Sequence, residues 1–304
     1  MSAGKMHIGE QDVDAALVGR LLAAQFPQWA DLPIVPFHSA GTDNALYRLG
    51  SDMVVRLPHI EGATGQIDKE QRWLPRLAPH LPLAVPVPRA SGVPGEGYPW
   101  QWSVYPWLPG ENATIVPITD PDRAALDLAH FIAALQRIDS TDGPPPGPHN
   151  FFRGVPLSTR DAQTRTAIAT LHGMLDTDAV TEAWEVALQA PAWGGPPVWI
   201  HGDLQPLNLL VQQGRLSAVI DFGGLGVGDP ACDLMVAWNL LSAHTRDVLR
   251  AALPVDDATW ARGRGWALSM GLIALPYYQS TNPVLAGIAR RAIAEVLADQ
   301  KHAA

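Results

Sequence analysis

Three polar residues between positions 199 and 223 have the types and spacing that a phosphoryl transfer needs. Asp203 follows an apolar segment, Asn208 comes five positions later, and Asp221 follows a further apolar segment. A carboxylate can orient an attacking hydroxyl group and accept its proton, while carboxylate and amide oxygens are good ligands for Mg²⁺. We therefore predict that Asp203 is a catalytic base and that Asn208 and Asp221 hold Mg²⁺ against the phosphates of a donor.

Short strands must position these three side chains. Apolar runs at 197–201, 207–212 and 216–221 are typical of such strands, and a loop containing glycine and proline follows the first of them. A hairpin made by the last two strands would bring Asp221 beside the loop that carries Asp203. One such residue alone would fit a solvated turn, but the combined spacing argues against that interpretation.

The first third of the chain has the pattern of a sheet with a leading helix. Apolar spacing predicts a helix at 11–26, and turn residues separate predicted strands at 33–38, 45–49 and 53–57. The turn at 50–52 is short, so the second and third strands should form a hairpin. The other predicted elements are a helix at 64–77 and strands at 84–91 and 101–106.

After a connector at 107–110 the pattern becomes helical. Pro121 suits the first position of a helix, and the proline-rich segment 143–149 cannot be regular structure. The predicted helices are 121–138, 159–174 and 178–190, with three or four more in 230–300. We therefore expect an α+β fold: residues 1–106 form a small, β-rich lobe, and residues 107–304 form a larger, mostly helical lobe.

The motif His-Gly-Asp-Leu-x-x-x-Asn at 201–208, followed by Ile-Asp-Phe-Gly at 220–223, resembles the aminoglycoside phosphotransferase family. The resemblance extends over residues 30–300 and includes the run at 228–234. It implies a bilobal, protein-kinase-like fold with a cleft between the lobes, ATP or GTP as the phosphate donor, and Mg²⁺. By the same resemblance, residues 1–106 are the nucleotide-binding lobe, and residues 107–304 carry the catalytic loop and the acceptor site. The three polar residues named first keep the roles of base and metal ligands.

The same resemblance implies that His201 supports the loop rather than taking part in the chemistry. Asp229 and Asp233 follow the motif, and we expect them to cap or brace the helix that comes next.

Arg56 stands where the kinase-like pattern has a lysine that contacts the phosphates of the nucleotide. Arginine stays charged and can bind phosphates through two N–H groups, although its geometry differs from that of lysine. Glu70, in the helix predicted at 64–77, is the expected partner of Arg56, and Glu61 ranks second. An exposed strand end is the alternative interpretation of Arg56.

The remaining predicted nucleotide contacts lie in a turn and in the connector. Ser39 and Thr42 could donate to phosphate oxygens, although an ordinary hairpin turn explains them equally well. By resemblance, the connector that includes Tyr105 binds the nucleotide base through backbone groups. Because proline has no N–H, these groups would be the carbonyl of Pro106 and the N–H of Leu108.

Composition narrows the class of partner. The chain has 304 residues, 47% of them hydrophobic, and a formal net charge of −9. An acidic protein repels nucleic acid and attracts cationic molecules. No stretch approaches a membrane span, the start has no signal-peptide pattern, and the single Cys232 permits neither an intrachain disulfide nor a cysteine metal cluster. We expect a cytoplasmic enzyme without nucleic acid or membrane partners.

The sequence identifies the acceptor less clearly than it identifies the phosphate-transfer site. The resemblance implies a small-molecule O-phosphotransferase that acts on a hydroxyl group of a cationic, aminoglycoside-like antibiotic, and hence antibiotic resistance. Carboxylates of the helical lobe could pair with such an acceptor, although a solvated helix face explains each of them more simply: Asp161, Asp178, Glu182, Glu185, Asp256 and Asp257. The tryptophans of this lobe have mostly core spacing.

Three alternatives remain open. The acceptor could be a macrolide, or the protein could be a metabolic kinase of the same fold that acts on choline, homoserine or a sugar. The third alternative is a nucleotide-binding protein without catalysis, which Arg56 favours and the intact Asp203, Asn208 and Asp221 oppose.

Overall fold

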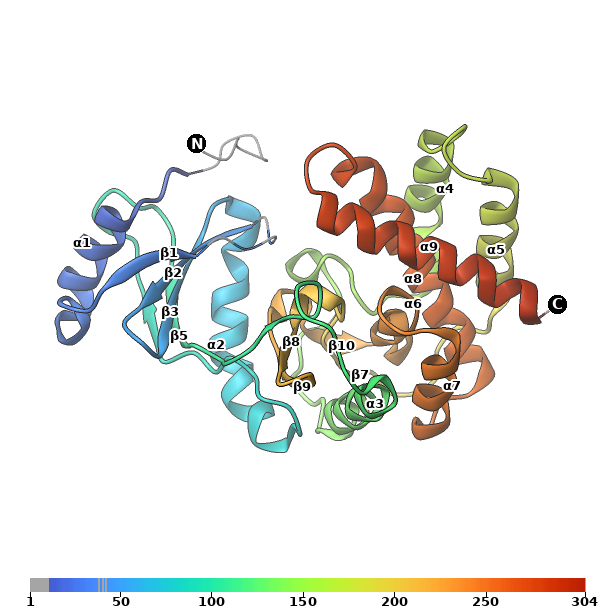
Figure 1. The fold of residues 1–304 in the computed structure, drawn as a ribbon, viewed down its shortest axis with the longest axis horizontal. Coiled ribbons are helices and arrows are strands. Elements are labelled where there is room, and N and C mark those ends of the chain that lie inside the picture. The colour runs from blue at the N-terminus through green and yellow to red at the C-terminus, as the bar shows by residue number, and fades with distance from the viewer. Residues whose placement is uncertain (1–10, 38, 40, 42, 304) are drawn as a thin grey trace. The chain divides into compact units, whose positions relative to one another are not determined.

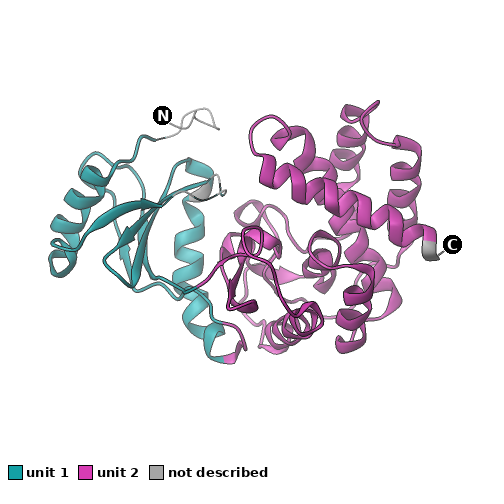
Figure 2. Ribbon diagram, viewed as in Figure 1, with its two compact units in different colours: residues 1–79, 84–109 teal, residues 80–83, 110–304 magenta. Residues whose placement is uncertain are grey.

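The computed structural model describes residues 11–37, 39, 41 and 43–303. Figure 1 shows the elements, and Figure 2 shows the two compact units into which the chain divides. One unit comprises Met1–Pro79 and Ala84–Pro109, and the other comprises His80–Leu83 and Gly110–Ala304. The first is built on a sheet and the second is mostly helical, so the expected α+β class is confirmed.

The first unit contains a five-stranded antiparallel sheet in the order β1-β2-β3-β5-β4. The strands are β1 (Ile34–Phe37), β2 (Asn44–Leu49), β3 (Met53–Pro58), β4 (Ala90–Gly92) and β5 (Trp102–Pro106), and the helices are α1 (Ala15–Gln25) and α2 (Gly65–Leu77). The predicted hairpin between β2 and β3 is present, and Gly50 takes a positive φ of 59° in its turn. Side chains alternate along β2, so Ala45, Tyr47 and Leu49 enter the core.

Two predictions for this unit need correction. The strand expected at 84–91 is wrong over most of its length, because β4 begins only at Ala90. Pro86 and Pro88 have no N–H group to donate to a neighbouring strand. The leading helix begins at Ala15 rather than residue 11, because the Asp14 side chain accepts a hydrogen bond from the N–H of Leu17 and caps the helix.

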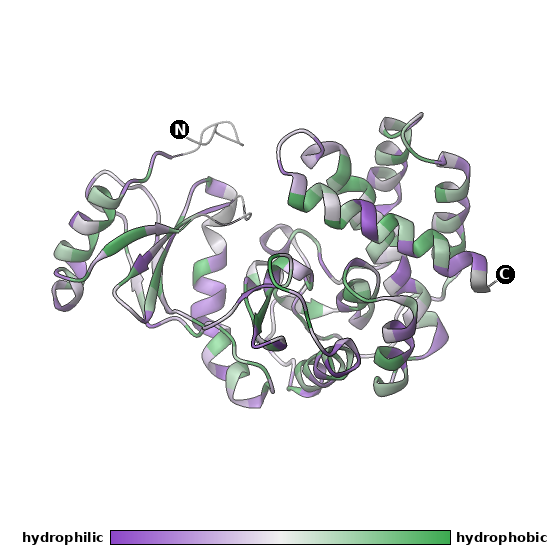
Figure 3. Ribbon diagram, in the orientation of Figure 1, coloured by the Kyte–Doolittle hydropathy of each residue, from purple (hydrophilic) through white to green (hydrophobic). Residues whose placement is uncertain are grey.

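The second unit contains seven helices among the described residues. They are α3 (Pro121–Arg137), α4 (Asp161–Thr170), α5 (Thr177–Gln189), α6 (Val236–Asn239), α7 (Ala243–Ala252), α8 (Asp257–Tyr278) and α9 (Pro283–Ala303). The long α8 packs against α4, α5 and α9. Along α9 hydrophobic and hydrophilic segments alternate (Figure 3), and its buried residues, which include Ala289, Ala292, Ile293 and Val296, recur at helical spacing.

Short strands connect these helices. β7 (Val198–Ile200) pairs with β10 (Gly226–Gly228), and β6 (Glu111–Asn112), β8 (Leu209–Gln212) and β9 (Arg215–Val219) form a second small sheet. We did not expect β6 and β10, because two or three residues are too few for a periodic pattern. Among the residues that the structure describes, no helix has the length and apolar character that crossing a membrane requires.

Candidate active site

The loop that follows β7 is held by the carboxylate of Asp233. Its Oδ2 accepts the backbone N–H of His201 at 2.8 Å, and its Oδ1 accepts that of Gly202 at 2.7 Å. Asp233 is fully buried, and this burial raises the pKa of its carboxyl group, although the two N–H donors favour the charged form. We expected Asp233 to cap or brace the next helix, but its oxygens instead bind back to the loop.

His201 joins this loop to the end of β9. Its Nδ1 accepts the backbone N–H of Asp203 at 3.2 Å, and its Nε2 lies 3.1 Å from the carbonyl oxygen of Ile220. This pattern requires a neutral ring with the proton on Nε2. The ring also packs against Phe222, with 4.6 Å between centroids. These contacts support the loop, as we expected of His201.

Asp203 has one occupied and one accessible oxygen. Its Oδ2 accepts hydrogen bonds from Nδ2 of Asn208 at 2.9 Å and from Nε2 of Gln205 at 2.7 Å. Its Oδ1 lies 3.8 Å from Nη2 of Arg153, too far for a hydrogen bond, and the side chain keeps 27% of its surface exposed. Oδ1 is therefore the oxygen of Asp203 that the predicted acceptor hydroxyl could reach.

Asn208 and Asp221 have the donor atoms that Mg²⁺ prefers. The Asn208 Nδ2 also donates to the carbonyl oxygen of Asp203 at 2.9 Å, so its Oδ1 is the atom available to a cation. Asp221 is exposed, has a positive φ of 61°, and follows Ile220, whose N–H donates to the carbonyl oxygen of Asn208 at 2.9 Å.

The described residues include no group of three or more histidine, cysteine and acidic side chains that could hold a metal. One carboxylate and one amide oxygen nevertheless fit Mg²⁺, which usually binds one or two protein ligands together with phosphates and water. Asn208 and Asp221 thus remain the predicted metal ligands.

Glycines allow the loops of this site to pack backbone against backbone. A Cβ atom on Gly202 would lie 2.3 Å from the carbonyl oxygen of Gly224, and one on Gly228 would lie 2.6 Å from that of Gly154. Both distances are far below van der Waals contact. Gly202 and Gly154 also have a φ of 82°, which larger residues rarely adopt. The loops at 147–154, 201–208 and 221–228 are therefore in direct backbone contact.

In the first unit, Arg56 and Glu70 form a buried ion pair. Nη1 of Arg56 lies 2.8 Å and 3.0 Å from the two carboxylate oxygens of Glu70, and its Nη2 donates to Gln66 at 2.6 Å. Arg56 is 9% exposed and Glu70 1%, so Arg56 is not an exposed strand end. The hydroxyl of Tyr105 also donates a hydrogen bond to the carboxylate of Glu70. The Tyr105 side chain is therefore part of the ion-pair cluster.

The other predicted nucleotide contacts are Ser39, Thr42 and the connector residues Pro106 and Leu108. Ser39 is exposed, and its hydroxyl oxygen accepts the N–H of Gly41 at 3.2 Å. Thr42 lies outside the described residues. Pro106 ends β5 opposite Met53, and Leu108 lies half-buried in the connector. Their contacts with a nucleotide remain predictions.

Sequence reasoning missed Arg153 and Gln205. Gln205 occupies a variable position of the motif, and Arg153 lies in an irregular segment after the proline-rich loop. Neither position carries a periodic or motif signal, and the side chain of Arg153 reaches Asp203 only because the loops at 147–154 and 201–208 pack together.

Four of the six carboxylates considered for the acceptor have partners within the second unit. Asp161 accepts hydrogen bonds from Trp184 and Arg165, at 2.7 and 2.8 Å, and Arg165 also lies 3.5 Å from Glu185. Asp257 pairs with Arg250 at 2.6 Å, and Asp256 caps α8. Hydrogen bonds from Thr259 lower the pKa of Asp256.

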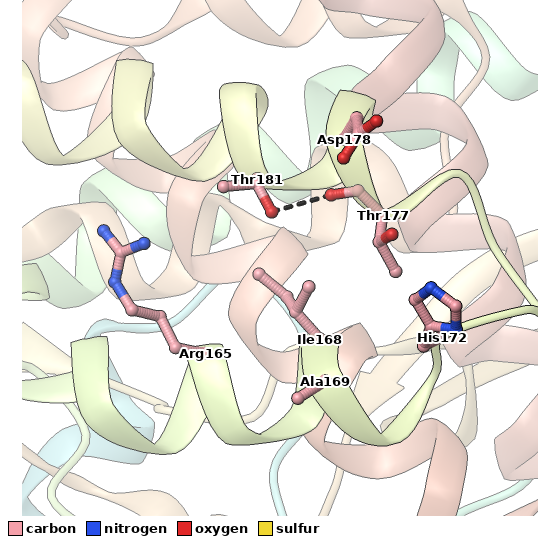
Figure 4. A pocket seen from close by; sticks show the side chains of 7 residues that line it. All are labelled: Arg165, Ile168, Ala169, His172, Thr177, Asp178 and Thr181. Carbon is pink, nitrogen blue, oxygen red and sulfur yellow. Dashed lines mark hydrogen bonds between the residues drawn. The ribbon is translucent and has the colours of Figure 1, made fainter.

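A pocket of about 310 Å³ lies between α4 and α5 (Figure 4). Its lining is formed by Arg165, Ile168, Ala169, His172, Thr177, Asp178 and Thr181. The Thr181 hydroxyl donates to the carbonyl oxygen of Thr177 at 2.7 Å, so part of the polar lining is already satisfied. The pocket includes Asp178 but no residue of the 201–208 motif, and it does not mark the catalytic loop.

The chain is similar to known phosphotransferases in sequence and fold. A family model described as "Phosphotransferase enzyme family" (APH) matches residues 34–266, a range that includes Arg56, Asp203 and Asp221. The uncharacterized protein YcbJ of Bacillus subtilis (strain 168) is 26% identical over 195 residues. That match covers 62% of this chain and 58% of YcbJ, so it spans little more than half of the relative's length.

Two solved structures share the fold. The GDP complex of wild-type aminoglycoside 2'-phosphotransferase-IIIa has a TM-score of 0.73 at 18% identity, covering 95% of this chain and 100% of that one. The macrolide 2'-phosphotransferase MphH of Brachybacterium faecium has a TM-score of 0.60 at 24% identity, covering 93% and 98%.

Proposed function

Because the chain belongs to the phosphotransferase enzyme family, we propose that it is a small-molecule kinase that transfers the γ-phosphoryl group of ATP or GTP to a hydroxyl group of an aminoglycoside-like acceptor. One observation carries this proposal. The carboxylate of Asp203 is fixed through Oδ2 by Asn208 and Gln205, on a loop anchored by buried Asp233, while Oδ1 remains accessible. A base held in this way is oriented before the acceptor arrives.

In the proposed reaction, Oδ1 of Asp203 accepts a hydrogen bond from the acceptor hydroxyl and receives its proton as the oxygen attacks the γ-phosphorus. Asn208 and Asp221 would hold Mg²⁺, which when bound offsets the charge of the donor phosphates. Arg56, kept in place by Glu70, would contact phosphate oxygens of the donor.

The relatives support the choice of donor and acceptor. The structure with the higher TM-score of the two is an aminoglycoside 2'-phosphotransferase in complex with GDP, which makes GTP and aminoglycosides the first substrates to test. At 18% identity, that likeness concerns the fold, so the acceptor has to be established by experiment.

A neutral sugar, whose reacting hydroxyl has no ammonium group beside it, is the second candidate acceptor, and one observation favours it. The guanidinium of Arg153 lies 3.8 Å from Oδ1 of Asp203, whereas Asp161, Glu185 and Asp257 are paired with arginines elsewhere. An ammonium group beside the reacting hydroxyl would be repelled by Arg153.

The experiment is a phosphorylation assay with purified protein, Mg²⁺ and either ATP or GTP. Kanamycin, gentamicin, a macrolide, choline, homoserine and a neutral sugar are offered separately, and phosphorylated product is detected by mass spectrometry. The Asp203→Asn variant serves as the control for contaminating kinases.

A product from an aminoglycoside that depends on Asp203 supports the leading proposal. A product from the neutral sugar alone selects the second candidate. A product from the macrolide, choline or homoserine alone would replace the aminoglycoside by that acceptor. Nucleotide binding without any phosphorylated product or nucleotide hydrolysis would overturn the proposal of a kinase.

A further inference from the structure

The guanidinium of Arg153 is buried beside Asp203 with little to bind. The residue is 9% exposed, and its Nε has no hydrogen-bond partner. Nη1 points to the sulfur of Met270, a weak acceptor, and Nη2 lies 3.8 Å from Oδ1 of Asp203. A buried donor without an acceptor is unfavourable, so this guanidinium is suited to a ligand with several oxygens.

A second buried arginine adds positive charge at the same place. Arg160 is 7% exposed, its Nη2 lies 3.5 Å from the Met270 sulfur, and its Nε donates to Ser269 at 3.0 Å. Its guanidinium also lies over the ring of Trp266, 4.8 Å from the centroid. Within the described part of the chain, Asp203 supplies the only carboxylate oxygen within 4.0 Å of either guanidinium.

Burial and the positive charge of Arg153 lower the pKa of Arg160 to about 10. Both effects disfavour a second positive charge at this position. An anion bound between the two guanidinium groups and Asp203 would reduce the repulsion between the two arginines.

The loop around Arg153 holds it in this environment. The buried Asn150 donates to the carbonyl oxygen of Arg153 at 3.1 Å and accepts the N–H of Gly147 at 2.9 Å. Phe151 and Phe152 both have a positive φ, 55° and 57°, although neither is glycine. Such conformations are costly and persist where the surrounding structure enforces them, often at functional sites.

We propose that Arg153 is a further catalytic residue, whose free N–H groups bind the oxygens of the phosphoryl group during its transfer, with Arg160 adding positive charge nearby. This inference rests on the proposed kinase function. It follows from the position of Oδ1 of Asp203, because a hydroxyl bound there must attack a phosphorus atom close to the guanidinium of Arg153.

The acceptor oxygen forms a bond to the γ-phosphorus, and the bond from that phosphorus to the β–γ bridging oxygen breaks. The electron pair of the broken bond stays on the nucleoside diphosphate, and the hydroxyl proton moves to Asp203. Arg153 offsets the negative charge on the oxygens of the moving group, where a fixed donor is most effective.

The test compares wild type with Arg153→Met and Arg153→Lys. Single-turnover hydrolysis of ATP and GTP with Mg²⁺ avoids the need for a known acceptor. We expect Arg153→Met to lower the hydrolysis rate by ~10²-fold or more, with the dissociation constant of the nucleotide changed less than ~3-fold. Arg153→Lys keeps the charge and should recover part of the rate. Arg123→Met removes an exposed arginine of α3 and is the matched control.

A second readout uses ADP or GDP with Mg²⁺ and fluoroaluminate, which imitates the phosphoryl group in transit. Wild type and Arg123→Met should melt at a higher temperature when fluoroaluminate is added to the diphosphate. Arg153→Met should lose this rise in melting temperature but keep the rise that the diphosphate alone produces. A variant that melts with wild-type cooperativity shows that folding is intact.

Hydrolysis of Arg153→Met at the wild-type rate overturns the inference. If this variant then turns over poorly only with an acceptor that carries a carboxylate or phosphate, Arg153 binds the acceptor's own anion instead. Absence of nucleotide binding in wild type would overturn the proposed function itself, so the two failures are distinguishable.

Discussion

The side-chain amide of Asn208 donates to Oδ2 of Asp203 at 2.9 Å, so the proposed base and a proposed metal ligand orient each other. The bond leaves one oxygen of each side chain available, Oδ1 of Asp203 for the acceptor and Oδ1 of Asn208 for Mg²⁺. A change in either side chain should therefore affect both the rate of phosphoryl transfer and the binding of Mg²⁺.

Asp203→Asn should lower kcat by at least ~10²-fold, the size of a typical general-base contribution, because an amide cannot accept the hydroxyl proton. Nucleotide affinity should change little. Steady-state kinetics with the acceptor found in the phosphorylation assay measure both quantities. Asp247→Asn, at an exposed position of α7, is the control, and near-normal turnover of Asp203→Asn would remove this residue from the mechanism.

Asp221→Asn should raise the Mg²⁺ concentration needed for half-maximal turnover by ~10-fold or more, because the predicted site loses its only charged protein ligand. A Mg²⁺ titration of initial rates at saturating nucleotide measures this concentration. An unchanged Mg²⁺ requirement, equal to that of Asp247→Asn, would show that Asp221 does not bind the metal.

Arg56→Met should lower the free energy of unfolding by about 3–5 kcal/mol, because Glu70 would remain buried without its cation. Urea unfolding measures the loss. The double variant Arg56→Met/Glu70→Met should lose less than the single variant, since it removes both charges. Arg20→Met removes an arginine of α1 that forms an exposed ion pair, and it is the control. If Arg56→Met destabilised the protein no more than Arg20→Met, the prediction would be contradicted.

Asp256→Ala should lower the free energy of unfolding at pH 7 by about 1 kcal/mol, the usual contribution of an N-cap. The pKa of Asp256 is lowered in the folded protein, so its stabilisation is present above the unfolded pKa of about 4 and is lost as the pH falls through the folded value.

Urea unfolding of wild type and Asp256→Ala at pH 7 and pH 3 tests this dependence. The difference between the two proteins should shrink at pH 3, while Asp247→Ala should differ little from wild type at either pH. A difference that is the same at both pH values would mean that the ionised carboxylate is not the capping group.

The elements predicted well from sequence are those whose signal is local. The hairpin of β2 and β3 has alternating side chains and a glycine turn, and α3 has a proline start and an apolar face. The family resemblance likewise rested on local motifs, and the family match bears it out. Asp203 and Asn208 could be proposed as site residues because their spacing within one loop is itself informative.

What sequence could not provide depends on contacts between distant segments. Asp233 binds a loop some thirty residues earlier, and Arg153 reaches Asp203 from a segment fifty residues before it. The strand β10 consists of two glycines and a valine, and only its partner β7 makes it a strand. Such contacts leave no periodicity in the chain.

The backbone contacts between Gly154 and Gly228 and between Gly202 and Gly224 have a consequence for protein engineering. Insertions or deletions in the loop at 147–154 would push directly on the segments that carry Asp203 and Asp221, so altering loop length is a poor route to a new acceptor range. The rings of Phe151 and Phe152 are 47% and 52% exposed on the same loop, so we expect exchanging them for residues that tolerate a positive φ to disturb that backbone less. A library confined to those two side chains is the better starting point for changing specificity.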